Sequence, residues 1–394
     1  MATSSSVLPF QGRAGGQPRR LVPSRLRDAR IAKRLNQSEL AALVGVTRQA
    51  ISAYEQGEKT PEAATLTLIA DVLEQPLSFF TREDREKFGD FGTRFFRAFG
   101  PDTKRRNLMC DVYANWMAQT ARYFDDLVNY PPVKLPSFAP ANANGEYTDE
   151  EIEDAASECR GQWGLGPGPV SNFLALAEAK GVIASGIALE REQIQAFSFW
   201  NGARPFIFLA SDTGSVARTR FDVAHEIGHL VLHRGIGQED VENPKVFKKV
   251  ETEANRFAGA LLLPRQSFPN EVFTTRLDAF VELKRRWKVA IQAMVYRCKD
   301  LGIFDEYQIT NLYKQISARK WRTREPLDDA DALPSEHPRT LQRAVSLVLS
   351  GGRKRSEDIT TELALAPNTI EGLCNLERGM LDLPEPELIE PILR

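Results

Sequence analysis

The sequence predicts a multidomain, mainly α-helical protein in which one short segment contributes β-structure. At 394 residues, the chain is long enough for two to four domains, each with its own core. Apolar residues recur at helical spacing along much of its length, and strand patterns appear between residues 181 and 210. We therefore expect an all-α amino-terminal domain, an α+β core and a helical carboxy-terminal region.

The composition narrows the classes of function. Hydrophobic residues make up 42% and charged residues 26%, as in ordinary globular proteins, and no run approaches 18 apolar residues, so no membrane span is expected. The net charge of −2 excludes nucleic-acid binding by the whole surface and leaves only a local site. The first twenty residues lack the apolar core of a signal peptide and should form a flexible tail. The cysteines have no C-x-x-C pair, which argues against a cysteine zinc site and a disulfide framework and indicates the cytoplasm.

Residues 21–80 are predicted to form a series of short helices. Asn36 is a suitable N-cap for a helix over Gln37–Leu43, and Gly45 lies in the turn that follows, where a left-handed backbone is easiest for glycine. Thr47 then caps a helix over Arg48–Glu55. The segment NQSELAALVGVTRQAISAYEQGEKTP resembles the Cro/repressor-type helix-turn-helix.

That resemblance implies binding to a double-stranded DNA operator. In the family, the second helix of the motif lies in the major groove, and two copies usually read two half-sites, so a homodimer is expected. The resemblance places Arg48, Gln49 and Ser52 towards base edges, with Gln37 and Thr47 near phosphates. Arg and Gln can bond bidentately to guanine and adenine.

The local charge agrees with this interpretation. Nine lysines or arginines stand against four acidic residues between Pro18 and Thr60. The alternatives are a helical bundle with a solvated charged face and a helix-turn-helix used only for protein contacts. We favour DNA binding because the motif, the residue types and the charge all point to it.

A helical spacer is predicted next. Apolar residues from Leu108 to Leu127 define one face of a helix, which favours packing in a core or a dimer over a membrane-surface role. The prolines from Pro131 to Pro140 interrupt the pattern and indicate a linker, so a domain boundary is expected near residue 145.

The stretch Phe221–Arg234, FDVAHEIGHLVLHR, contains three of the four histidines in the chain. His225, Glu226 and His229 form H-E-x-x-H on a segment with helical periodicity. Positions four apart lie one above the other on a helix, so His225 and His229 can reach one Zn²⁺ ion while Glu226 takes a proton from water. His233 lies at i+8, about 12 Å along a straight helix from His225, and is expected to be a helix-end or supporting residue.

A catalytic zinc site needs a third protein ligand. The helix ETEANRFAGALLLP, Glu251–Pro264, has one apolar face, and helical phase places Glu251 and Asn255 together at its edge. Glu253 is expected to point well away from that face. We therefore predict Glu251 as the third ligand, with Asn255 bonding the free ring nitrogen of a ligating histidine.

Three strands should accompany the metal helix. The segments Gln195–Trp200 and Arg204–Ala210 flank Asn201-Gly202, a strong hairpin signal, and Gly181–Ser185 is a third strand. The strand RPFIFLA has a proline near its start, which is typical of an edge strand. An edge strand beside a metal site can hold an extended peptide through backbone bonds.

The two motifs together resemble a known family. H-E-x-x-H followed by E-x-x-x-N is similar to the gluzincin peptidases, and RTRFDVAHEIGHLVLH with ETEANRFAGALLLP resembles the ImmA/IrrE metallopeptidases over roughly Glu146–Phe268. This implies a gluzincin-like α+β core and a zinc endopeptidase that cleaves a repressor-like regulatory protein. By position, His225, His229 and Glu251 are metal ligands and Glu226 is the general base. A chance H-E-x-x-H on a structural helix is disfavoured by the second motif.

The remaining segments are less informative. Arg218, Arg220 and Tyr296 are candidates for stabilising an oxyanion, and both arginines suit surface salt bridges equally well. RRWKVAIQAMVYRCKDLGIF resembles the helical extension that commonly follows this peptidase core. We interpret the basic run Lys284-Arg285-Arg286 as a solvated face, and Trp287 beside it as part of an aromatic core, rather than as a second nucleic-acid site. The final segment should form a small helical cap.

The sequence thus divides into six predicted parts: a flexible tail at 1–20, a helix-turn-helix domain at 21–80, a helical spacer and linker at 81–145, a zinc peptidase core at 146–270, a helical extension at 271–325 and a helical domain at 326–394. We expect a cytoplasmic, DNA-bound zinc endopeptidase. The alternative is a non-proteolytic transcription factor whose metal domain senses a signal or docks a partner. In a third possibility, the DNA module only localises the enzyme beside its target.

Overall fold

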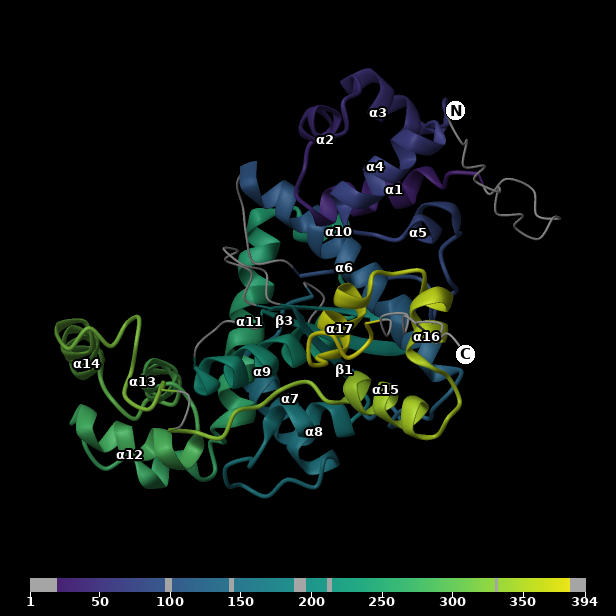
Figure 1. Cartoon of the computed structure of the whole chain (residues 1–394). Helices are drawn as coiled ribbons and strands as arrows, with labels where there is room; N and C mark the ends of the chain where they lie inside the picture. Colours follow the sequence, from purple (N-terminus) through teal and green to yellow (C-terminus); the bar gives the residue numbers. More distant parts are fainter. Residues whose placement is uncertain are drawn as a thin grey trace, which may run out of the picture. The chain divides into compact units, whose positions relative to one another are not determined.

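The fold is mainly α-helical with a small three-stranded sheet, as the sequence predicts (Figure 1). This computed structural model describes residues 20–95, 101–141, 145–187, 196–210, 215–329 and 332–382. The flexible tail predicted for residues 1–20 therefore lies outside the described residues, apart from Arg20.

The chain divides into two compact units, residues 1–84 with 364–366 and residues 85–363 with 367–394. The division into six parts remains a prediction. Among the described residues, no helix is both long enough and apolar enough to cross a bilayer.

The described residues of the first unit form five short helices, and local signals explain where these helices begin and end. Asn36 and Glu39 form a reciprocal capping box at the start of α2, and the Thr47 side chain accepts a hydrogen bond from the Ala50 amide at the start of α3. Gly45 ends α2 with a φ of 71°, which allows the tight turn between the two helices. The helices are α1 (Pro23–Ala32), α2 (Gln37–Val44), α3 (Arg48–Gln56), α4 (Ala63–Leu73) and α5 (Leu77–Thr81).

The second unit is built on a sheet with the strand order β1-β3-β2. Its strands are β1 (Ile183–Ile187), β2 (Ala196–Asn201) and β3 (Arg204–Ala210), and the hairpin predicted at Asn201-Gly202 is confirmed by the antiparallel pairing of β2 and β3. The expectation that RPFIFLA is an edge strand is wrong, because β1 pairs with its other side in parallel. That pairing begins at Phe206, so Pro205 lies outside it and removes no bond from it.

The outer edge of β2 is partly covered by the segment formed by residues 88–95. The Gly92 amide donates to the Trp200 carbonyl at 2.8 Å, and the Gly202 amide donates to the Asp90 carbonyl at 2.8 Å. Phe91 forms an antiparallel bridge with Asn201. Gly202 has a φ of 57°, and a Cβ at this position would collide with the Phe88 carbonyl. This segment therefore extends the sheet at the carboxyl end of β2.

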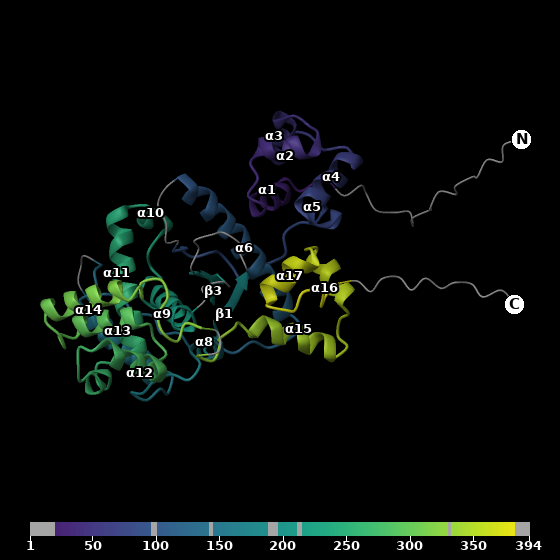
Figure 2. The ribbon, with the colours of Figure 1, turned by 60° about the vertical axis from the view of Figure 1, so that its left-hand side comes forward.

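The long helix α9 (Val216–Leu232) packs against this sheet, and a second long helix, α11 (Pro244–Leu262), packs beside α9 (Figures 1 and 2). Gly228 makes their close approach possible, since a Cβ there would lie 3.2 Å from the Ala254 Cα and 3.2 Å from the Phe257 ring. Phe257 and Ala258 are fully buried in the shared core. The small side chain at Ala254 also serves this approach.

Helices on either side complete the second unit. Figures 1 and 2 both show α12 to α14 as one group and α15 to α17 as another, and the latter group lies against β1 and α6. Trp287 is buried in the core, as expected, but Lys284 from the predicted solvated face is fully buried between Glu325 and Asp328. The remaining elements are α6 (Pro101–Asp125), α7 (Asp149–Gln162), α8 (Phe173–Ala179), α10 (Gln238–Val241), the 3₁₀ helix η1 (Phe268–Glu271), α12 (Leu277–Trp287), α13 (Ile291–Asp300), α14 (Glu306–Ala318), α15 (Thr340–Ser350), α16 (Ser356–Leu363) and α17 (Pro367–Cys374).

Candidate metal centre

Three side chains from α9 and α11 converge on one point. The Nε2 atoms of His225 and His229 lie 3.0 Å apart, and the Glu251 Oε1 lies 3.5 Å from the first and 3.1 Å from the second. The histidines are one helical turn apart on α9, and the close packing at Gly228 brings α11 near enough for Glu251 to reach them. The structure thus brings together the three residues that the sequence proposes as ligands.

This arrangement fits a zinc ion. Two imidazole nitrogens and one carboxylate oxygen are ligands of the kind that catalytic zinc sites use. Donors about 2.0 Å from a tetrahedral ion are separated from one another by roughly 3.3 Å. The observed separations of 3.0, 3.1 and 3.5 Å lie around that value. Burial raises the pKa of Glu251, but its hydrogen bonds and charge interactions with the two histidines lower that pKa overall, which favours the carboxylate.

Each histidine has a second contact through its other ring nitrogen. The Nδ1 of His225 lies 3.1 Å from the Asn255 Oδ1, and the Nδ1 of His229 lies 3.0 Å from the Nδ1 of His233. Asn255 is therefore in contact with a histidine ring nitrogen, as proposed from helical phase, although its effect on a metal remains a prediction. Glu226, the proposed base, follows His225 directly and is buried.

Glu253 differs from the expectation. It was predicted to point well away from the buried face of α11, yet only 7% of it is exposed. Its Oε2 lies 3.0 Å from the Nε2 of His233, and its Oε1 accepts a hydrogen bond from the Tyr147 amide. The prediction was wrong because it used only the apolar positions of α11. The end of α9 and the chain before α7 cover a further side of the helix. Burial lowers the pKa of His233 to about 4.

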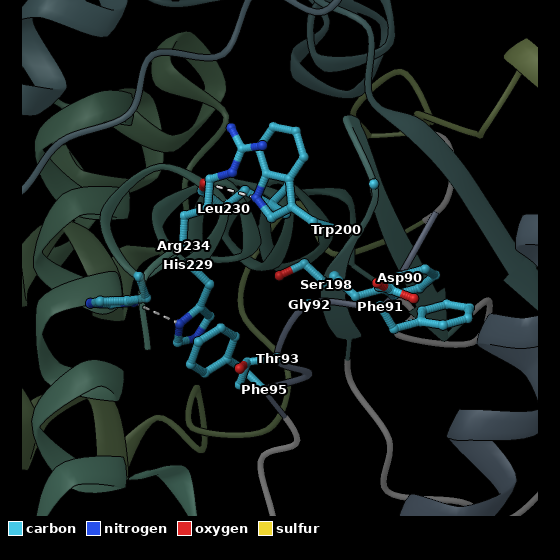
Figure 3. A pocket seen from close by; sticks show the side chains of 13 residues that line it. Asp90, Phe91, Gly92, Thr93, Phe95, Ser198, Trp200, His229, Leu230 and Arg234 are labelled. Atoms are coloured by element: carbon cyan, nitrogen blue, oxygen red, sulfur yellow. Dashed lines mark hydrogen bonds between the residues drawn. The ribbon is translucent and has the colours of Figure 1, made fainter. Parts of the chain in front are cut away.

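A pocket of about 260 Å³ adjoins the centre, between β2, the end of α9 and segment 88–95 (Figure 3). The Phe95 ring stacks on the His229 ring with centroids 4.3 Å apart and planes inclined by 7°. The Trp200 indole donates to the Leu230 carbonyl at 3.1 Å and ties β2 to α9 (Figure 3). Sequence reasoning missed Phe95, because no local pattern relates a residue of the predicted spacer to a helix so far along the chain.

The oxyanion candidates are engaged elsewhere or exposed. Arg220 is buried, pairs with Glu336 and donates to the Val170 carbonyl at 2.6 Å. Arg218 donates to the Thr323 carbonyl at 2.6 Å. Both arginines thus join α9 to other segments, whereas Tyr296 is 46% exposed on α13. Among the described residues, no hydrogen bond joins any of these three candidates to His225, His229 or Glu251.

The proposed DNA-binding residues lie on α2 and α3. Arg48 and Gln49 are exposed in the first turn of α3, and Ser52 is half-buried one turn later. Thr47 caps the same helix. The Gln37 Nε2 donates to Glu55 at 2.9 Å, and Glu55 also pairs with Arg30. The caps of α2 and α3 and the Glu55 carboxylate therefore hold these two helices in place. The roles of the exposed residues towards DNA remain predictions.

Comparison with known proteins finds a family match for each of two segments of the chain. Residues 177–299 match the family described as IrrE N-terminal-like domain, of the M78 peptidases, and residues 26–80 match a helix-turn-helix family. The chain is 27% identical over 176 residues to the radiation response metalloprotease IrrE of Deinococcus radiodurans. The match covers 41% of this chain and 51% of that protein, so the chain spans about half the length of its curated relative.

Proposed function

We propose that this chain, in which a helix-turn-helix domain is joined to an IrrE-like metallopeptidase domain, is a DNA-binding transcriptional regulator with zinc-dependent endopeptidase activity. Its substrate is a repressor or another regulatory protein. The protein works in the cytoplasm, because its DNA partner lies in that compartment. The observation that carries the proposal is the convergence of His225, His229 and Glu251 beside Glu226, in a chain whose other unit carries exposed Arg48 and Gln49 on α3.

The proposed chemistry assigns one role to each group. His225, His229 and Glu251 would hold a zinc ion, which would polarise the scissile carbonyl and lower the pKa of water towards 7. The Glu226 carboxylate accepts a proton from the attacking water and delivers it to the leaving amine. Asn255 would accept the Nδ1 proton of His225, which leaves the Nε2 lone pair of His225 available to a metal ion beside His229 and Glu251.

The substrate is proposed to bind as an extended peptide along β2. Edge strands offer unpaired backbone groups to such peptides. β2 is an edge of the sheet, and α9 packs against it. Segment 88–95 pairs with its end at Trp200 and Asn201. The substrate would therefore use the earlier part of β2, near Ser198, whose hydroxyl donates to the Glu226 carbonyl at 3.3 Å.

DNA recognition is proposed to use the exposed side of α2 and α3. Arg48, Gln49 and Ser52 would face base edges, and Gln37 and Thr47 would face phosphates. The amide of Gln37 has a second N–H besides the one given to Glu55, so it can serve a phosphate without losing that bond. Two copies bound to half-sites would form a homodimer on the operator.

The Glu226→Gln variant tests the catalytic part of the proposal. The protein composition of cells with the wild type is compared with that of cells with the variant, and the zinc content of both purified proteins is measured. We expect zinc in both proteins and a cleaved regulatory protein only with the wild type. If both proteins hold zinc and the regulatory output is the same, the peptidase proposal fails. The metal domain is then a sensor or a docking module.

A second experiment separates DNA reading from proteolysis. Once a cleaved protein is known, the wild type and a variant with Arg48→Ala and Gln49→Ala are compared on it in solution. Equal cleavage by both, with operator binding lost only in the variant, supports a DNA module that localises the enzyme beside its target. Loss of cleavage without DNA would contradict that arrangement.

A further inference from the structure

We propose that His233 and Glu253 are positioning residues that fix the ring orientation and tautomer of His229 through a relay of two hydrogen bonds. The inference rests on the proposed metal function of His229. Two contacts carry it. The Nδ1 atoms of His229 and His233 are 3.0 Å apart, and the Nε2 of His233 is 3.0 Å from the Glu253 Oε2.

The direction of each hydrogen bond follows from the metal end. A histidine that binds a metal through Nε2 must carry its proton on Nδ1. His229 therefore donates from Nδ1, and the Nδ1 of His233 must accept. His233 then carries its own proton on Nε2 and donates it to the carboxylate of Glu253. With a metal on the Nε2 of His229, this is the arrangement of protons that satisfies both contacts.

The relay is anchored at its far end. The second oxygen of Glu253 accepts the Tyr147 amide at 3.2 Å, and the Lys249 ammonium lies 4.0 Å from the same oxygen. The Tyr147 hydroxyl donates to the Leu232 carbonyl at 3.0 Å, in the last turn of α9. A buried carboxylate is costly unless it is hydrogen-bonded and paired, and these contacts meet that need. The carboxylate is therefore held in place relative to α9.

The two histidines of the motif are thereby supported differently. His225 is supported by the neutral amide of Asn255, whereas His229 is supported by an imidazole and, behind it, a carboxylate. A carboxylate hydrogen-bonded behind a ligating histidine raises the basicity of the ring, which makes it a stronger metal ligand, and fixes its orientation. The third histidine of the stretch thus has a role that the ligand set alone does not give it.

The test measures Zn²⁺ affinity by competition with a chromophoric chelator. Glu253→Gln keeps the shape of the side chain and removes its charge, and His233→Ala removes the middle of the relay. We expect both to bind Zn²⁺ about 10- to 100-fold more weakly than the wild type. Glu153→Gln is the matched control, because Glu153 is a buried carboxylate paired with Arg297 and not with the histidines. It should bind Zn²⁺ as tightly as the wild type.

A second readout separates positioning from a structural role. Nitrogen NMR of the His229 ring in the zinc-free proteins should report a proton on Nδ1 in the wild type and a mixture of tautomers in Glu253→Gln, with unchanged thermal unfolding. If Glu253→Gln is folded and has both wild-type affinity and a wild-type His229 spectrum, the relay is overturned. If His233→Ala does not fold, the Zn²⁺ affinity and the His229 spectrum of Glu253→Gln decide whether the relay exists. If Glu251→Ala also keeps full Zn²⁺ affinity, the proposed metal site has failed rather than the relay.

Discussion

The candidate metal centre and the proposed DNA-reading surface place their functional groups in opposite ways. His225, His229 and Glu251 converge from two packed helices, and the two histidines are almost completely buried. Arg48 and Gln49 project from one helix, and both are exposed. A buried site is organised by the fold before any partner arrives, whereas an exposed reading surface completes its bonds only on DNA. Substitutions in the two regions should therefore have different consequences for the protein alone.

The largest expected effect is on catalysis. Glu226→Gln should lower the rate of peptide cleavage by about 10²- to 10⁴-fold, because it removes the general base. Zinc content and the unfolding temperature should change little, since neither ligands nor packing are altered. Initial rates on an identified substrate provide the measurement. Cleavage at the wild-type rate would remove Glu226 from the mechanism.

How well the sequence predicts each region follows from the same difference. Helical phase within each of two segments suffices to propose His225, His229 and Glu251 as a cluster, and they do converge. It failed for Glu253, because the segments that bury this residue come from elsewhere in the chain. It likewise gave no sign of Phe95 on His229, since that contact depends on tertiary structure.

The sheet shows the same limit. A proline near the start of a strand suggested an edge, but strand order is set by pairing between distant segments, and β3 is central. The hairpin at Asn201-Gly202 was predictable because its signal is local. The amino-terminal caps at Asn36 and Thr47 were predictable for the same reason.

The second prediction concerns the helix contact that assembles the centre. Gly228→Ala should destabilise the protein by about 1–3 kcal/mol, because its methyl group would meet the Ala254 backbone and the Phe257 ring at 3.2 Å. Zinc affinity should fall as well, since Glu251 lies on α11, the helix that the added methyl group would push away. Urea unfolding and chelator competition measure the two effects. Gly161→Ala is a control at an open helical position. Equal stability of the two variants would contradict the tight-contact account.

In the DNA-reading unit, Arg48→Ala should weaken specific operator binding by about 1–3 kcal/mol and relax the base preference at one position. Its unfolding free energy should stay within about 0.5 kcal/mol of the wild type, because the side chain is exposed. Fluorescence anisotropy on matched and mismatched duplexes gives the first quantity. A loss of stability as large as the loss of DNA affinity would erase the contrast between the two regions.

The smallest effect is expected at a residue placed near phosphates. Gln37→Ala should weaken binding to all duplexes about equally, by roughly 0.5–1.5 kcal/mol, because phosphate contacts carry no sequence information. The comparison is made with the same matched and mismatched duplexes. A change in base preference would show that Gln37 reads a base and not the backbone.

The proposed function depends most directly on the identity of the metal ligands. Its decisive measurement is the zinc content per chain of the purified wild type and the Glu251→Ala variant, after both are dialysed against the same chelator. We predict one zinc ion per chain in the wild type and almost none in the variant. A variant that keeps its zinc, or a wild type that never binds it, would contradict the two-helix metal centre.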